Sequence, residues 1–256
     1  MLGEGVSLAA GAKPILLCWR RSGRRINRAA RPYGSPRIHA VLRRQGIICG
    51  KNRVARLMRV SGIQGRVRRR SCPVTTQRAE GALAAPNVLA QDFTANRPNQ
   101  KWVTDVTYVH TQQGWAFLST IKDLYDGFIV AHTFGQNNSV QLVTDMLRQA
   151  KHKEKVTDGL ILHSDQGHQY TSQAYYDVLV TEYNIIPSMS RRGNCWDNAP
   201  MENFFGHLKE EYLRHVKNPS FEEACQLVDD YIYFFNYERI QLKTKQTPFQ
   251  RRCLSR

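Results

Sequence analysis

From Lys101 onward, the chain carries a succession of hydrophobic patterns that few folds can accommodate. Residues 102–109, 115–121 and 128–134 alternate in polarity and are rich in β-branched and aromatic side chains, which predicts three consecutive strands. A Gln-Gln-Gly sequence at 112–114 supplies the turn between the first two strands. Consecutive strands joined by short connections form an antiparallel meander, so the first half of the sheet is expected to be antiparallel.

Helices and strands alternate after this meander. The expected order is a helix over 139–150, a short strand over 160–162, a helix over 172–183, an extended segment over 185–189, and helices over 198–214 and 221–237. Strands that are reached through helical crossovers lie parallel to their neighbours. The pattern therefore predicts one α/β domain, with a mixed sheet and helices on both faces.

The basic residues are concentrated in the first third of the chain. Residues 1–80 contain 19 Lys and Arg but only two acidic residues, whereas residues 81–256 contain 18 basic and 19 acidic residues. The net charge of +16 therefore resides in the first third. A block this basic binds a polyanion by releasing counterions, and arginine suits phosphate groups. No amphipathic membrane anchor accompanies the block, so nucleic acid is the expected partner rather than a lipid surface.

Two short helices around a glycine turn are predicted within this basic block. Ile38, Val41 and Leu42 form an apolar stripe on the first helix, and a second helix over 51–60 follows the turn at 46–50. This arrangement is typical of a helix-turn-helix domain, although a helical hairpin with a solvated basic face would give the same pattern. The side chains expected to contact DNA are Arg37, Lys51, Arg53, Arg56, Arg59, Arg68, Arg69 and Arg70.

These patterns divide the chain into four parts. Residues 1–30 lack periodicity and are expected to be a poorly ordered basic segment, and residues 31–65 form the helix-turn-helix domain. Residues 66–97 contain an arginine run and scattered Pro and Gly, which predicts a linker. Residues 98–256 form the α/β domain with a C-terminal helical extension.

The cysteines and the apolar runs bear on the compartment. The six cysteines are far apart and form no C-x-x-C motif, which argues against a zinc knuckle and a disulfide scaffold. No apolar run approaches the roughly 20 residues that cross a bilayer, so no membrane association is expected. A reducing cytoplasm is the expected location.

Three carboxylates occupy positions that this layout makes unusual. Asp105 lies in the middle of the first strand, where Asp is disfavoured. Asp165 follows the strand over 160–162, at a strand end where ligand-binding residues collect. Glu202 lies in the first turn of a helix whose apolar stripe faces another direction. If the first and fourth strands are neighbours, the three side chains come together.

Two interpretations of these acids are open. Taken singly, Asp105 can pair with a lysine, Asp165 can belong to a turn, and Glu202 can favour the helix dipole. Taken together, without a cluster of Cys or His, they form an all-oxygen site of the kind that binds Mg²⁺ or Mn²⁺. Two such ions form the clamp that promotes in-line phosphoryl transfer. His163 and His168 lie near Asp165, and we expect them to be polar neighbours rather than ligands.

Several runs of residues carry a resemblance to a known family. The motifs are PNQKWVTDVTY at 98–108, HSDQGHQYTS at 163–172, SMSRRGNCWDNA at 188–199, ENFFGHLK at 202–209, NYERIQL at 236–242 and Thr247-Pro248. With them, residues 87–252 resemble the OrfB catalytic subunit of bacterial insertion-sequence transposases of the IS-three group, in the retroviral-integrase superfamily. Upstream, residues 33–59 are similar to the helix-turn-helix that precedes this core.

The resemblance implies a ribonuclease H-like integrase core preceded by a small all-α helix-turn-helix domain. It implies a D,D,E triad of Asp105, Asp165 and Glu202 that uses two Mg²⁺ ions, or Mn²⁺, to cleave DNA and transfer strands. It also implies that Lys209 contacts the terminal DNA of the element. Seven residues separate Lys209 from Glu202, which is about two helical turns, so both lie on one helix face.

The same resemblance implies partners and a place in the cell. The partners are the terminal repeats of the element and the target DNA, a homo-oligomer assembled on DNA, and an OrfA-like product of an upstream frame, fused or separate. Such a protein acts in the cytoplasm, at the nucleoid. One departure from the family is a single extra residue between Asp165 and Glu202, which we place in the connection at 181–187.

Two aromatic features have alternative interpretations. Trp196 can anchor its loop or stack on an unpaired base, and the sequence favours the anchor. The aromatic run at 231–237 is expected to pack in the core rather than to form a binding platform.

Three functions are compatible with these features: a transposase, a plain metal-dependent nuclease of the same fold, and a non-catalytic DNA-binding regulator of transposition. The complete triad argues against the regulator, and the motifs beyond the triad argue against the plain nuclease.

Overall fold

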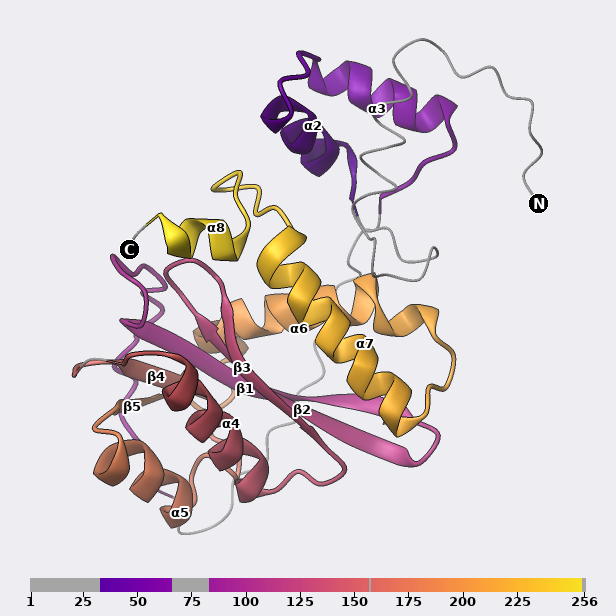
Figure 1. The fold of residues 1–256 in the computed structure, drawn as a ribbon. Coiled ribbons are helices and arrows are strands. Elements are labelled where there is room, and N and C mark those ends of the chain that lie inside the picture. The colour runs from indigo at the N-terminus through magenta and orange to yellow at the C-terminus, as the bar shows by residue number, and fades with distance from the viewer. Residues whose placement is uncertain (1–32, 66–82, 157, 255–256) are drawn as a thin grey trace.

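The structure is a computed structural model that describes residues 33–65, 83–156 and 158–254. A small helical domain precedes an α/β domain, and the C-terminal helices return towards the helical domain (Figure 1). Within these ranges, none of the helices combines the length and the apolarity that crossing a membrane would require. The segment predicted to be poorly ordered, residues 1–30, lies outside the described residues.

The helical domain consists of α2 (Ser35–Arg44) and α3 (Lys51–Val60), at the bounds that the sequence predicts. Ile38 and Leu42 of α2 are buried against α3, because they recur on one face of the helix. The outer face of α3 has no acidic residue to balance its lysine and arginines. The helix-turn-helix arrangement is therefore confirmed.

The α/β domain is built on one sheet with the strand order β3-β2-β1-β4-β5. The strands are β1 (Lys101–Thr111), β2 (Gly114–Asp123), β3 (Ile129–Gly135), β4 (Ile161–Ser164) and β5 (Ile186–Met189). β2 pairs antiparallel with β1 and β3, whereas β4 is parallel to β1 and β5. The predicted mixed sheet is confirmed, and the first and fourth strands are neighbours.

Helices cover both faces of this sheet (Figure 1). They are α4 (Val140–Lys153), α5 (Gln173–Tyr176), α6 (Ala199–Glu211), α7 (Phe221–Tyr233) and α8 (Pro248–Cys253). Successive strand residues point to opposite faces, so Trp102 packs with α4 and α5 whereas Val103 packs with α6 and α7. Of the aromatic run at 231–237, Tyr231, Phe234 and Phe235 are buried in the core beneath α6 and α7, as predicted, whereas Tyr233 and Tyr237 are exposed.

Two helices end in wider, π-type winding that the sequence pattern does not predict. α5 continues as η1 (Asp177–Glu182), and α7 continues as η4 (Phe234–Glu238). A π-type turn holds more residues than an α-helical turn, so it absorbs an extra residue without ending the helix. η1 overlaps the start of the connection at 181–187, where the sequence places the extra residue between Asp165 and Glu202.

The described part of the predicted linker lies against the α/β domain. Leu89 is buried, and its N–H donates to the hydroxyl of Ser188 on β5. Asn87 and Gln91 also bind a side chain of the α/β domain, as described below. The rest of the linker, which includes Arg68, Arg69 and Arg70, lies outside the described residues.

Candidate active site

Asp105 and Asp165 lie at the same level of two neighbouring parallel strands. The parallel register pairs Val103 of β1 with His163 of β4. Asp105 lies two residues beyond Val103, and Asp165 lies two residues beyond His163. Since side chains two residues apart in a strand share a face, Asp105 projects from the side of the sheet that carries Val103 and faces α6, and Asp165 lies just beyond the end of β4.

Two contacts hold the beginning of α6 against the sheet beside Asp105. The side-chain amide of Asn198 donates to the carbonyl of Thr104, the residue before Asp105, over 3.0 Å. The ammonium of Lys122 on β2 donates to the carbonyl of Pro200 over 3.2 Å. Both contacts place Glu202 over β1. Asn198 occupies the N-cap position of α6, but its side chain does not cap the helix; the sequence does not predict the bond to Thr104, because Thr104 lies on a distant strand.

The other charged groups of the site shift the pKa of Asp105. Burial, together with the negative charges of Asp165 and Glu202, raises the pKa of Asp105 well above its ordinary value. The N–H of Val106 at 2.8 Å and the positive charge of Lys209 act in the opposite direction. Asp165, Glu202 and Lys209 are thus each within electrostatic reach of Asp105.

Asp165 is oriented by the turn that follows β4. The N–H of Gly167 donates to Oδ1 of Asp165 over 3.0 Å. A Cβ atom at position 167 would lie 3.1 Å from that oxygen and 2.9 Å from the amide nitrogen of Gln169. A side chain at position 167 would crowd the carboxylate of Asp165 and the amide of Gln169, so the glycine of the HSDQGHQ motif lets the backbone lie close to the Asp165 carboxylate.

The neighbouring histidines are engaged in other contacts. His163 shares hydrogen bonds with the hydroxyls of Ser188 and Ser190, and burial lowers its pKa to about 4, so the ring is neutral. His168 bonds the carbonyl of Asn138. Among the residues that the structure describes, no three His, Cys, Asp or Glu side chains are close enough together to hold a metal ion. That the histidines are polar neighbours rather than ligands stays a prediction.

The loop between β5 and α6 is anchored by Asp197 and not by Trp196. Asp197 is fully buried and accepts hydrogen bonds from the backbone and guanidinium of Arg191, and from the side chains of Asn87 and Gln91. The Trp196 side chain is 71% exposed, so the anchoring role that the sequence favours is wrong. Stacking on an unpaired base, the other interpretation, stays a prediction.

The basic side chains of the helical domain fall into two groups. Lys51, Arg53, Arg56 and Arg59 are exposed along α3. Arg37 of α2 instead lies at the contact with the α/β domain, where its Nε donates to the carbonyl of Ile240 over 3.3 Å. The α3 face is therefore a basic surface that is open to a polyanion.

Profiles of known families match both domains. A family described as "Integrase core domain" matches residues 95–195, and a second family with the same description matches residues 202–254. A family described as "HTH-like domain" matches residues 20–71. The matched regions include all three predicted acids and both helices of the helical domain.

The chain is also similar to individual proteins. The putative transposase InsK for insertion sequence element IS150 of Escherichia coli (strain K12) is 39% identical over 223 residues, which cover 86% of this chain and 77% of that protein. The simian T-cell lymphotropic virus intasome, solved by cryoEM in complex with the PP2A regulatory subunit B56 gamma, contains a chain with a TM-score of 0.53 and 16% identity. That match covers 86% of this chain and 74% of the viral one.

The HTLV-2 integrase catalytic core domain, solved in complex with magnesium in a dimeric form, matches with a TM-score of 0.50 and 18% identity. That match covers 62% of this chain and 99% of the viral domain. The two viral structures establish the integrase-type fold, and the bacterial relative establishes the family. The chain therefore belongs to the insertion-sequence transposases, and it is an integrase-type transposase that acts in DNA transposition.

Proposed function

We propose that Asp105, Asp165 and Glu202 are the catalytic carboxylates of a Mg²⁺-dependent reaction that cleaves element ends and transfers them to target DNA. The observation that carries this proposal is the environment of Asp105, a half-buried carboxylate inside a strand that senses the charges of two further acids. Such an arrangement is costly unless a cation compensates it. Buried acids with structural roles in this chain, such as Glu211, are instead bonded directly to arginine.

The donor set fits magnesium. All three side chains offer carboxylate oxygens, which Mg²⁺ prefers. Mg²⁺ is commonly held by one or two carboxylates, with water and substrate phosphates completing its shell, so a site of three close acids is not required before DNA binds. Asp105 and Asp165 would hold the ion, joined by Glu202. When bound, the ion stabilises charge on the attacking and leaving oxygens. The presence of magnesium in the HTLV-2 integrase core supports this choice.

The protein side chains contribute placement and charge. Gly167 and Val106 donate backbone N–H groups to Asp165 and Asp105, which fixes the orientation of both carboxylates. Burial lowers the pKa of Lys209, and the charge of Asp105 raises it. The ammonium of Lys209 beside Asp105 suits a DNA phosphate next to the scissile bond.

The exposed basic face of α3 supplies the binding of the terminal DNA. Its four basic side chains can enter a groove of the terminal DNA or contact its phosphates, and each phosphate contact adds about 0.9 to the slope of log affinity against log salt. Assembly of several copies on DNA is part of the proposal and is supported by the intasome that contains the related viral chain.

Substitution of the three acids tests the proposal. In the full chain, Asp105→Asn, Asp165→Asn and Glu202→Gln should each abolish cleavage and joining of element-end DNA in Mg²⁺ or Mn²⁺, while DNA binding persists. Asp145→Asn is the matched control, because Asp145 is a half-exposed acid of α4 that pairs with Arg148. Normal strand transfer by Glu202→Gln would refute the triad. If the wild-type protein cleaves element ends without joining them, it is a nuclease. If it binds element ends without cleaving them, it is a regulator.

Lys209 is tested in the same assay. Lys209→Ala should impair end processing with little change in folding stability, and Lys209→Arg should retain part of the activity because the charge survives. Lys217→Ala is the control, since Lys217 is exposed beyond the end of α6. Equal activity of Lys209→Ala and the wild-type protein would remove Lys209 from the site.

A further inference from the structure

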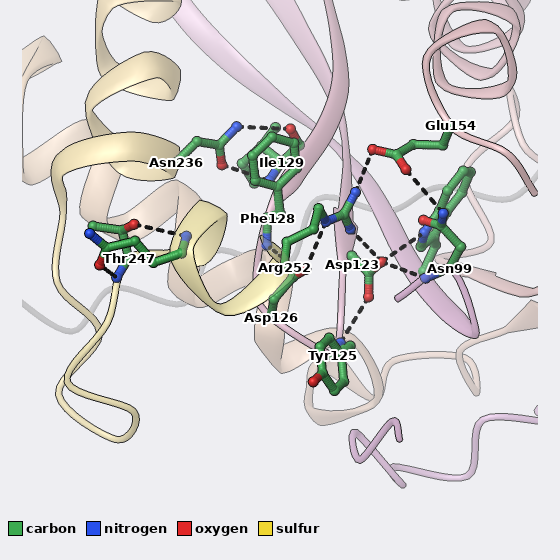
Figure 2. Close-up of polar contacts among 12 residues, drawn as sticks. Asn99, Asp123, Tyr125, Asp126, Phe128, Ile129, Glu154, Asn236, Thr247 and Arg252 are labelled. Atoms are coloured by element: carbon green, nitrogen blue, oxygen red, sulfur yellow. Dashed lines mark hydrogen bonds and ion pairs between the residues drawn. The ribbon is translucent and has the colours of Figure 1, made fainter. Parts of the chain in front are cut away.

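The segment Phe234–Ile240, which includes the first five residues of the NYERIQL motif, touches three parts of the molecule at once. Its first contact is with the sheet. Asn236 accepts a hydrogen bond from the N–H of Ile129 on β3 and donates one to the carbonyl of the same residue, over 2.8 and 3.0 Å (Figure 2). This pair of hydrogen bonds fixes the segment to the sheet through the side-chain amide of Asn236 and the backbone of Ile129.

The second contact is with the helix that carries Glu202. Arg239 forms a bidentate pair with Glu211, the last residue of α6, with Nη2–Oε1 at 2.6 Å and Nε–Oε2 at 2.9 Å. The hydroxyl of Tyr231 donates to the same carboxylate at 3.1 Å, and Nδ1 of His207 lies 3.3 Å from it. Arg239 and Glu211 are almost fully buried. A planar, two-bond pair in a dry environment permits one arrangement of its partners.

The third contact is with the helix-turn-helix domain. The hydroxyl of Tyr33 donates to the carbonyl of Glu238 over 3.1 Å and accepts from the N–H of Ile240 over 2.9 Å. These two backbone groups flank Arg239 on both sides. Tyr33 is only 2% exposed, and its ring packs on Phe234. The docked domain therefore holds the backbone from which the Arg239 side chain extends.

Helix α6 is consequently fixed at both ends. Asn198 and Lys122 hold its beginning against the sheet, and Arg239 holds its end. Glu202 and Lys209 lie on α6 between these attachments. A displacement of about 1 Å at a catalytic group is enough to reduce a rate strongly.

We propose that Tyr33 and Arg239 are positioning residues, through which docking of the DNA-binding domain sets the place of α6 and of the catalytic groups on it. The segment Phe234–Ile240 is the junction that transmits this placement. The inference rests on the proposed catalytic role of Glu202. It assigns a function to a motif that contributes no group to the acidic site.

Tyr33→Phe in the full chain tests the junction, because it keeps the ring and removes only the hydroxyl that bonds both sides of Arg239. Tyr212→Phe is the matched control. Tyr212 is buried in the same aromatic cluster, and its hydroxyl has no hydrogen-bond partner among the described residues. Tyr33→Phe should lower kcat for end cleavage about tenfold, as expected for the loss of two hydrogen bonds. The KM for end DNA should change less than about twofold. Tyr212→Phe should change neither.

Hydrogen exchange supplies a readout that is independent of activity. Backbone amides near the end of α6 should exchange faster in Tyr33→Phe and in Arg239→Lys, which keeps the charge but loses the bidentate geometry, and not in Tyr212→Phe. Unchanged kcat and exchange in Tyr33→Phe would overturn the proposal. Equal losses in Tyr33→Phe and Tyr212→Phe would also overturn it, by showing general softening of the core. Activity of Glu202→Gln would instead refute the proposed function. The hydrogen-exchange data would still test whether the junction holds α6 in place, because they do not depend on catalysis.

Discussion

The C-terminal part of the chain places two buried arginines against carboxylates, and the two clusters differ in their balance of charge. Arg239 faces one carboxylate, that of Glu211. Arg252 of α8 faces three: it lies 2.6 Å from Asp123 and 2.7 Å from Asp126, and it also pairs with Glu154 (Figure 2). Both arginines are about equally buried. The comparison therefore isolates the number of acids as the variable.

This difference gives the two clusters opposite acid–base behaviour. Although burial opposes the ionisation of Glu211, Arg239 and His207 hold the pKa of Glu211 at about 2. Burial and the negative charge of Asp126 raise the pKa of Asp123 to about 6, in spite of Arg252. The pair of Arg239 with one carboxylate keeps that carboxylate ionised. The cluster of Arg252 with three carboxylates, called the overloaded cluster below, leaves one carboxylate that takes up a proton easily.

The largest effect is expected from removing the arginine of the overloaded cluster. Arg252→Met should lower the free energy of unfolding by about 3–5 kcal/mol or more, because it leaves three carboxylates without their shared cation. Arg239→Met leaves one carboxylate unpaired and should lower the free energy of unfolding by less. Urea unfolding at pH 7 measures this free energy for both variants. A larger decrease in Arg239→Met would show that the number of carboxylates left without an arginine does not determine the loss of stability.

The sequence predicts well those features that follow from local pattern. The bounds of α2 and α3 match because an apolar stripe and a glycine turn mark them. The order of strands and helices follows from the switch between two-residue and helical periodicity. Asp105 could be singled out because a carboxylate inside a strand is unusual in itself.

Features that depend on distant partners were not predictable. Charged residues are assigned to the surface by default, so nothing local marks Arg239, Glu211 or Arg252 as buried. The anchoring role of Asp197 depends on Asn87 and on other partners far away in the chain. The π-type winding of the two helices was missed because the apolar pattern is the same for α-helical and π-helical turns over so few residues.

The dependence of stability on pH sharpens the comparison, because the two clusters should respond with opposite signs. The pKa of Glu211 in the folded protein is below its ordinary value of 4.5, so its contribution to stability is complete above that pH and is lost as the pH falls towards 2. The pKa of Asp123 in the folded protein is above its ordinary value of 3.8, so its contribution to stability grows as the pH falls from 6 to about 4. Each pKa shift corresponds to a change of roughly 3 kcal/mol in the free energy of unfolding once the pH lies beyond both the folded and the unfolded pKa.

Variants that cannot titrate separate the two contributions. As the pH falls from 6 to 4, the free energy of unfolding of the wild-type protein should rise relative to that of Asp123→Asn. Below pH 4.5, it should fall relative to that of Glu211→Gln. Chemical unfolding of the three proteins at a series of pH values gives both differences. Slopes of the same sign would mean that charge balance does not distinguish the clusters.

The smallest effect is expected from Asp126→Asn, which removes one acid from the overloaded cluster. The variant relieves repulsion with Asp123. In the wild-type protein, one carboxylate oxygen of Asp126 accepts from the N–H of Phe128 and the other accepts from the guanidinium of Arg252 (Figure 2). The asparagine side chain has an NH₂ group in place of one of these oxygens, so it cannot keep both hydrogen bonds. These effects oppose each other, and the free energy of unfolding should change by less than about 1 kcal/mol. The pKa of Asp123, followed by NMR titration, should move only part of the way towards its ordinary value, because burial is the larger cause of its shift. A pKa that stays near 6 would assign the whole shift to burial and would remove repulsion between the acids from the account of this cluster.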